Sequence, residues 1–206
     1  MPQLLGGYVY VWPYYLGGAL AYLLGSIPFG LLLTQLAGLG DIRRIGSGNI
    51  GATNVLRTGR KGLAALTLML DFGKGLAAVL IADLFGPDMA IFAAFGVLLG
   101  HMFPVWLRFK GGKAVATAGG VLMALSWPSG LTALATWLVI AVASRYSSLA
   151  ALATCVLAPA YAFLFTRRLD TTEIVGLIGL LVILRHRANI ARLLRGEESK
   201  IALRAK

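Results

Sequence analysis

Long uncharged stretches of apolar residues constrain this chain more than any other feature of its sequence. No Asp, Glu, Lys or Arg occurs before Asp41, and residues 114–144 are also uncharged. A helix that crosses a bilayer needs about 20 predominantly apolar residues. Hydrophobic residues make up 58% of the chain and charged residues only 13%, against about 25% charged in soluble domains. The sequence therefore predicts an all-α integral membrane protein, with one membrane-embedded domain over residues 1–206.

The apolar runs predict a bundle of about seven transmembrane helices. Turn-forming residues separate them, including Trp-Pro-Ser-Gly at 127–130, which divides the uncharged run 114–144 into two short halves. No basic segment precedes the first run, so we do not expect a cleaved signal peptide. The fourth, fifth and seventh runs are short, and five or six spans remain an alternative. The expected spans cover residues 12–36, 63–85, 89–107, the two halves of 114–144, 146–165 and 171–184.

The net charge of +11 fits a cytoplasmic membrane face better than a nucleic acid. With the N-terminus outside and the C-terminus inside, every Lys and Arg except Lys74, Arg167 and Arg168 lies on the cytoplasmic side, as basic loops do. Residues after Leu184 predict a basic amphipathic helix at that interface. Cys155, as a lone cysteine, makes no intramolecular disulfide, and two histidines and one cysteine do not compose a metal site.

The first candidate site is the segment GSGNIGATN, which lies on the predicted cytoplasmic face. Glycines let several backbone N–H groups turn towards one point, and small polar side chains add donors, so such a segment binds anions. A helix starting near Thr53 would add its positive end, with Arg57 one turn on. The alternative is an ordinary turn between two spans. The residues concerned are Gly46, Ser47, Gly48, Asn49, Gly51, Thr53 and Asn54.

A second glycine-rich segment, residues 100–117, combines the same elements. Gly111 and Gly112 precede Lys113, which would open the fourth helix, so flexible N–H groups, a helix end and a cation come together. The spacing is not that of a Walker A loop, since Ala114 follows the lysine. The alternative is a basic loop whose long side chains merely extend to the membrane–water interface. His101 and Pro104 are expected to end the third helix.

A third segment, residues 185–200, places His186 and Asn189 three residues apart on one helix face. That face lies where the last span leaves the membrane, and either a structural or a catalytic histidine fits. Glu198 is expected to pair with a nearby arginine. Asp71 and Lys74, also three apart, lie inside the second span, where a charged residue is costly unless it is paired. We interpret them as a structural ion pair.

Taken together, these motifs resemble the bacterial integral-membrane glycerol-3-phosphate acyltransferases that use acyl phosphate. LLGSIPFG at 23–30 with IGSGNIGATNVLR at 45–57, GHMFPVWLRFKGGKAVAT at 100–117 and RHRANIARLLRGEESKI at 185–201 are similar to that family's three motifs, in the same order. LDFGKG at 70–75 matches a further family pattern. One departure is Ala114, which stands where the family usually has glycine.

The resemblance implies the first step of phospholipid synthesis at the cytoplasmic face of the bacterial inner membrane. The 1-hydroxyl of sn-glycerol 3-phosphate would attack an acyl phosphate, giving lysophosphatidic acid and phosphate. It implies no cofactor, metal, nucleic acid or obligate protein partner. By the same resemblance, His186 and Asn189 would orient glycerol phosphate, and the two glycine-rich loops would surround the phosphates. The side chains that would bind the phosphates are Ser47, Asn49, Thr53, Arg57 and Lys113.

Two questions stay open at the level of sequence. The base is either His186 or an oxygen of the donor phosphate, and we favour the phosphate because an acyl phosphate is already activated and needs mainly positioning. The alternative function is a small anion transporter or channel subunit, which the basic glycine-rich loops also fit. Against it, the polar motifs lie on one membrane face and only the pair Asp71 and Lys74 marks the interior.

Overall fold

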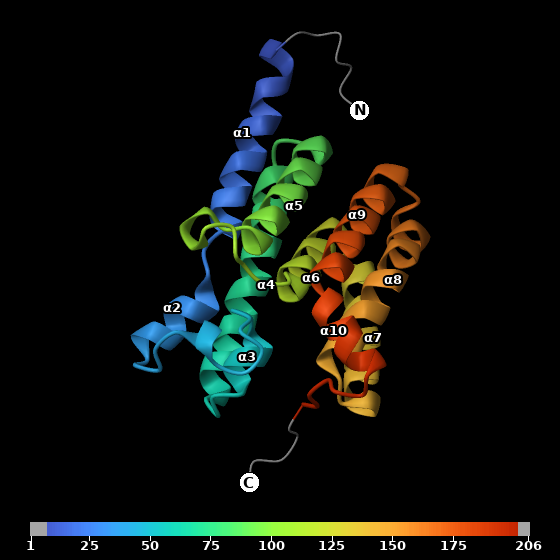
Figure 1. Ribbon diagram of the computed structural model, residues 1–206. Coiled ribbons are helices and arrows are strands. Elements are labelled where there is room, and N and C mark those ends of the chain that lie inside the picture. Colours follow the sequence, from blue (N-terminus) through green and yellow to red (C-terminus); the bar gives the residue numbers. More distant parts are fainter. Residues whose placement is uncertain (1–7, 202–206) are drawn as a thin grey trace. The chain divides into compact units, whose positions relative to one another are not determined.

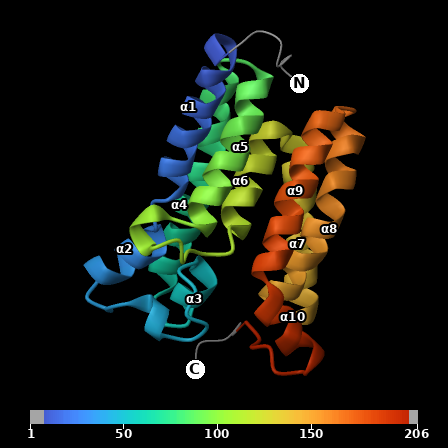
Figure 2. The ribbon, with the colours of Figure 1, turned by 45° about the horizontal axis from the view of Figure 1, so that its top comes forward.

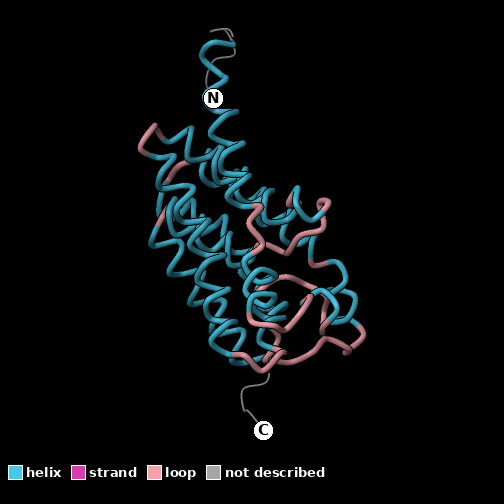
Figure 3. The backbone as a smooth tube through the Cα atoms, turned by 90° about the vertical axis from the view of Figure 1, so that its left-hand side faces the viewer, coloured by secondary structure: helices cyan, strands magenta, loops and turns pink. Residues whose placement is uncertain are grey.

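The computed structural model describes residues 8–201, in which all regular structure is helical (Figure 3). The chain forms two compact units that divide between Leu125 and Ser126, and each unit is described by itself. The division falls at the Trp-Pro-Ser-Gly break, where Ser126 caps the next helix by accepting a hydrogen bond from the N–H of Ser129. The predicted break inside the uncharged run is therefore confirmed.

The first unit combines long helices with several short ones (Figure 1). The expected first span is two helices rather than one, because Pro28 has no N–H to continue the first helix past Gly25. Two 3₁₀ turns, η2 and η3, lie in the loops. The elements are α1 (Tyr8–Gly25), α2 (Phe29–Leu36), η2 (Ile42–Arg44), α3 (Ala52–Leu56), α4 (Lys61–Asp83), α5 (Pro87–Met102), η3 (Val105–Leu107) and α6 (Val115–Leu125).

Glycines bring the helices of the first unit unusually close together. A Cβ atom at Gly96 of α5 would overlap the backbone oxygen of Gly18 of α1, and one at Gly75 of α4 would overlap the backbone oxygen of Thr117 of α6. Small residues allow such backbone approach between membrane helices, where van der Waals packing drives association. The contact at Gly75 holds α6, and hence the loop that precedes it, against α4.

The second unit consists of three successive helices that pack against their neighbours in sequence, followed by a short helix (Figure 2). The last two helices meet at an angle of 61° around His186, which ends one and begins the other. A short helix thus lies where the sequence predicts a basic amphipathic one, and Leu194 at its end is exposed. The helices are α7 (Trp127–Ser144), α8 (Ser147–Thr166), α9 (Leu169–Arg185) and α10 (Arg187–Leu194).

Five segments of the described chain are long and apolar enough to cross a membrane, or six if α9 and α10 form one bent span. The first of them combines α1 and α2. The expected count of seven is not confirmed, because α6 has only 11 residues, fewer than the roughly 20 that a straight span needs. Arg204 and Lys206, which the charge argument places inside, lie outside the described residues.

Candidate active site

Asn54 organises the first glycine-rich loop. Its Oδ1 accepts hydrogen bonds from the N–H and the hydroxyl of Ser47, at 3.0 and 3.3 Å. Its Nδ2 donates to the carbonyl oxygens of Ile42, Ile45 and Asn49, at 2.8–3.0 Å. The side chain is buried, and these bonds engage both ends of its amide. Asn54, expected to bind substrate, therefore holds the loop in shape.

Side chains around this loop remain exposed and close to its glycines. Ser47, Thr53 and Arg57 are exposed, and the Arg57 side chain lies against Gly46, where a Cβ atom would come within 2.9 Å of Cδ. Gly46 also has a φ of 57°, a conformation that favours glycine. Because α3 has only five residues, its dipole adds little. The hydroxyls of Ser47 and Thr53 and the guanidinium of Arg57 are therefore the exposed polar groups of the predicted anion site.

The second loop folds back on the end of α5. The N–H groups of Gly111 and Gly112 donate to the carbonyl oxygens of Met102 and His101, at 3.1 and 3.0 Å. Lys113 is half-buried and precedes α6 by two residues rather than opening it. The intervening Ala114 is buried with a φ of 58°, which explains why glycine suits this position in the family that the sequence resembles.

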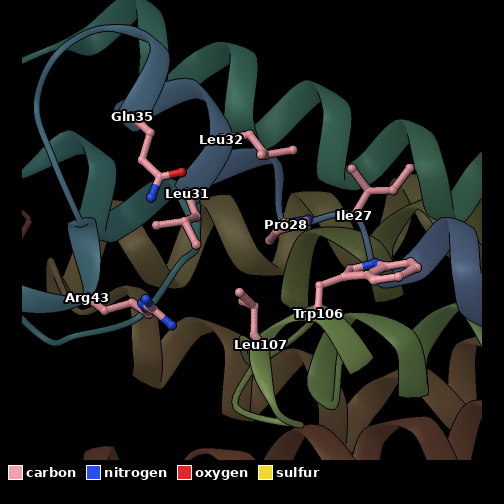
Figure 4. A pocket seen from close by; sticks show the side chains of 8 residues that line it. All are labelled: Ile27, Pro28, Leu31, Leu32, Gln35, Arg43, Trp106 and Leu107. Carbon is pink, nitrogen blue, oxygen red and sulfur yellow. The ribbon is translucent and has the colours of Figure 1, made fainter.

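An apolar groove of the first unit has Arg43, Trp106 and Leu107 in its lining, whereas the glycine-rich residues of the two loops are not part of that lining. Leu107, from the second segment, packs against a buried cluster that includes Ile42, Ile50 and Val55 of the first. The groove has a volume of about 500 Å³. Figure 4 shows Gln35 and Arg43 towards one end and Trp106 beside Ile27 at the other. Its lining residues are Ile27, Pro28, Leu31, Leu32, Gln35, Arg43, Trp106 and Leu107.

Arg43 is a groove residue that the sequence argument did not single out. Its guanidinium makes three hydrogen bonds to the Asp41 carboxylate: Nη2 donates to Oδ2 at 2.6 Å, and Nε donates to Oδ1 at 2.9 Å and to Oδ2 at 3.1 Å. The side-chain bonds from Arg43, followed by its backbone N–H, lower the pKa of Asp41 to about 2. Asp41 is therefore ionised at neutral pH, and this pair fixes a guanidinium at the groove.

Asp71 and Lys74 form the expected ion pair inside α4, with Nζ 2.8 Å from Oδ1. His101, in the last turn of α5 as expected, brings Nδ1 to 3.5 Å from the same oxygen. The hydroxyl of Thr117 on α6 lies 3.1 Å from that nitrogen. Thr117 carries no signal in the sequence, because its partner comes from another helix.

The third segment lies in the second unit. His186 is buried, and its Nδ1 lies 2.8 Å from the carbonyl oxygen of Val182. A carbonyl only accepts, so Nδ1 carries the proton and a neutral ring has its lone pair on Nε2. Asn189 is also buried and donates to Glu198 at 2.6 Å. Glu198 pairs with Arg192 at 2.7 Å, as predicted.

Comparison with known proteins places these features in one family. The model of a family described as glycerol-3-phosphate acyltransferase matches residues 15–196. A glycerol-3-phosphate acyltransferase of Brucella anthropi is 56% identical over 181 residues, covering 87% of this chain and 89% of its own length. One from Rhodospirillum rubrum is 57% identical over 194 residues, covering 90% and 89%.

Solved structures agree with the sequence relatives. The crystal structure of PlsY (YgiH), an integral membrane glycerol 3-phosphate acyltransferase, in its glycerol 3-phosphate form is 41% identical, with a TM-score of 0.88 over 92% of this chain and 96% of its own. Its lysophosphatidic acid form is 40% identical, with a TM-score of 0.86. Both the fold and the membrane setting of the chain are thus similar to those of PlsY.

Proposed function

The chain belongs to the glycerol-3-phosphate acyltransferase family, and we propose that its donor is an acyl phosphate. The reaction would transfer the acyl group to the 1-hydroxyl of sn-glycerol 3-phosphate and give lysophosphatidic acid and inorganic phosphate. One observation carries the proposal: the first unit holds an apolar groove with the guanidinium of Arg43 in its lining, and Leu107 of that lining packs against Ile50 of the first glycine-rich loop. An acyl phosphate has the matching pair of features, an anionic head and an apolar chain.

Two phosphates must be held close together in this reaction, one on the donor and one on the acceptor. The N–H group of Gly46, with the side chains of Ser47, Asn49 and Thr53, would supply hydrogen bonds. The N–H groups of Gly48, Gly111 and Gly112 donate to the carbonyl oxygens of Ile45, Met102 and His101, so these glycines would instead let the backbone come close to a phosphate. Arg57 and Lys113 would supply the charge. Charge-assisted hydrogen bonds of this kind are roughly twice as strong as neutral ones. Which phosphate each loop holds is a matter for the kinetics of single variants.

In the proposed step, the oxygen of the 1-hydroxyl attacks the carbonyl carbon of the acyl phosphate. The new carbon–oxygen bond forms as the bond between that carbon and the bridging oxygen breaks, and phosphate leaves with the electron pair. Lys113 would stabilise the charge on the carbonyl oxygen and on the leaving phosphate. The hydroxyl proton passes to a phosphate oxygen, whose second pKa is about 6.

His186 and Asn189 would orient glycerol phosphate rather than take its proton. Protonation at Nδ1, enforced by the Val182 carbonyl, gives the neutral ring an acceptor at Nε2 for the substrate hydroxyl. The apolar groove would receive the acyl chain. As in the sequence argument, we propose that the loops face the cytoplasm of a bacterial inner membrane with the N-terminus outside. A reporter fused after Lys206 should then read cytoplasmic, and an external reading contradicts this topology.

The decisive experiment uses the full chain in detergent, where no sealed membrane exists. We expect one phosphate released per glycerol phosphate acylated with an acyl phosphate donor, and no turnover with an acyl thioester of the same chain length. An anion transporter would give no product there. Turnover with the thioester alone would overturn the donor assignment.

Two variants test the anion sites directly. Arg57→Ala and Lys113→Ala should each lower the transferase activity by about 10- to 150-fold, which is what one charge-assisted hydrogen bond contributes. Both variants should remain folded. Arg60→Ala removes an exposed arginine three residues from Arg57 and is the matched control, with activity within about twofold of wild type because surface substitutions are usually mild. More than half the activity in both site variants would contradict the assignment.

A further inference from the structure

Four polar side chains form a buried cluster beside the second loop of the first unit. They come from α4, α5 and α6: Asp71, Lys74, His101 and Thr117. Each is at most 4% exposed, and the contacts of Asp71 with Lys74 and His101, and of His101 with Thr117, join them into one network. Burying charges in a membrane protein is costly, so the question is what this network achieves that apolar packing would not.

One end of the cluster touches the loop that carries Lys113. The carbonyl oxygen of His101 accepts a hydrogen bond from the N–H of Gly112 at 3.0 Å. The imidazole fills the space that a side chain at position 112 would occupy, since a Cβ atom there would overlap Nε2. The backbone that leads directly into Lys113 thus lies against a ring that Asp71 and Thr117 hold.

The other end of the cluster touches the break in the first span. Nζ of Lys74 donates a 2.9 Å hydrogen bond to the carbonyl oxygen of Ile27 and lies 5.5 Å from the ring centroid of Phe29. Phe29 begins α2, which packs against the first loop so closely that a Cβ atom at Gly30 would overlap the backbone oxygen of Ile50. Lys74 therefore ties α4 to the element that supports the first loop.

We propose that Asp71, Lys74, His101 and Thr117 are positioning residues that hold the Lys113 loop in register with the first loop. This inference rests on the proposed function, which gives the two loops their phosphates. The cluster touches backbone at both ends: Gly112 through His101, and Ile27 through Lys74. The bond between the Gly112 N–H and His101 is made by the backbone, so the side-chain contribution at that end is the packing of the imidazole against Gly112. Apolar side chains would bury the same surface, but they would neither fix the ring orientation through Thr117 nor bond to the carbonyl oxygen of Ile27. A misplacement of about 1 Å at such a site can cost roughly 100-fold in rate.

The mildest test changes Thr117, which joins the cluster through its contact with His101. Thr117→Val keeps the shape of the side chain and removes the hydroxyl that holds His101, whereas Thr117→Ser keeps the hydroxyl. We expect kcat to fall about two- to tenfold in Thr117→Val, the value of one hydrogen bond, and to recover in Thr117→Ser. Thr132→Val is the matched control, because the Thr132 hydroxyl bonds only to Pro128 in its own helix, at 2.8 Å.

Hydrogen exchange gives a second measurement that needs no turnover. In the full chain in detergent, Thr117→Val should speed amide exchange over residues 110–114, where the N–H of Gly112 donates to the carbonyl oxygen of His101. Exchange in α4 and α5 should stay as in wild type. Thr132→Val should change neither. If Thr117→Val proves too unstable to extract, His101→Asn keeps an amide near the place of Nδ1 but removes the ring from Gly112, and the same local change is expected.

The proposal requires both effects. A lower kcat without faster exchange in the loop contradicts it, and so does faster exchange with normal kcat. Faster exchange throughout α4, α5 and α6 would show general loosening and would also overturn a positioning role. A wild type that exchanges as expected but does not use acyl phosphate would instead overturn the proposed donor, so the two failures are distinguishable.

Discussion

Nδ2 of Asn189 donates a 2.6 Å hydrogen bond to Oε1 of Glu198, so a side chain that we propose at the reaction centre is also tied to the segment that follows α10. The hydroxyl of Ser148, on α8, donates to the same oxygen at 2.9 Å, and Nε of Arg192 donates to Oε2 at 2.7 Å. Burial opposes ionisation of this carboxylate, but the three donors outweigh it and hold the pKa of Glu198 below its usual range.

We therefore expect Glu198→Gln to destabilise the protein while Glu197→Gln does not. Glutamine replaces one of the two oxygens by an N–H₂ group that faces a donor, and it removes the charge that all three donors share, which should lower the free energy of unfolding by about 1–3 kcal/mol. Glu197 pairs with Arg195 at the exposed surface, where such a pair is worth little. Denaturant titration in detergent measures both variants. Equal stability of the two would contradict the anchoring role of Glu198.

The same contacts make stability depend on pH in a defined direction. The pKa of Glu198 in the folded protein lies below its ordinary value of 4.5, so the unfolded chain takes up the proton first as pH falls. The contribution of Glu198 is complete above that value and is lost as pH falls through the folded pKa. Titration of wild type against Glu198→Gln should show a stability difference that is constant near neutrality and shrinks in acid. A difference that grows in acid would contradict this assignment.

Asn54 should be far less tolerant of a carboxylate than Asn49. Asn54→Asp puts an oxygen where Nδ2 now donates to three carbonyl oxygens, and the repulsion should cost more than about 2 kcal/mol of unfolding free energy. In Asn49→Asp the oxygen that accepts from the N–H of Gly51 at 3.2 Å is retained. That variant should stay stable and bind phosphate more weakly. Comparable unfolding curves for the two would contradict the role of Asn54.

Two glycines on α4 provide a matched test of helix packing. Gly75→Ala would push a methyl group against the backbone oxygen of Thr117. Overpacking of this kind lowers the free energy of unfolding by about 1–3 kcal/mol. Gly73→Ala meets no atom within 4 Å and should be neutral or stabilise by up to about 1 kcal/mol. Thermal unfolding in detergent separates them. Similar melting of both variants would show that α6 does not press on Gly75.

The helices were largely predictable because apolar length is a local property of the chain. The break at 127–130 was visible for the same reason, since proline and glycine interrupt the run. The break at Pro28 was missed, because the uncharged run continues through it. The count of seven is not confirmed at α6, whose apolar run continues beyond the helix, and the alternative of five or six spans agrees with the long apolar helices that the described residues form.

Within the site, the sequence identified residue types better than their partners. The spacing of Asp71 and Lys74 predicted their pairing, but nothing local linked them to Thr117 or to the carbonyl of Ile27. Asn54 looked like a ligand because an amide can face either a substrate or its own loop, and only the folded backbone decides. Only the structure shows why glycine suits position 114: Ala114 has a φ of 58°, a conformation that costs a non-glycine residue about 1–2 kcal/mol.

Steady-state kinetics can show whether His186 orients glycerol phosphate or acts as the general base. If His186 only binds and orients glycerol phosphate, His186→Gln should chiefly raise the KM for that substrate, because binding shared by ground and transition states is lost. If it is the general base, kcat should fall by about 100- to 10,000-fold even at saturation, and one limb of the pH profile should disappear. We expect the first result, with some loss of kcat from poorer alignment. The ring is held by Val182 through Nδ1, and the donor phosphate brings an oxygen able to take the proton. An unchanged KM with a thousandfold lower kcat and a missing pH limb would make His186 the base.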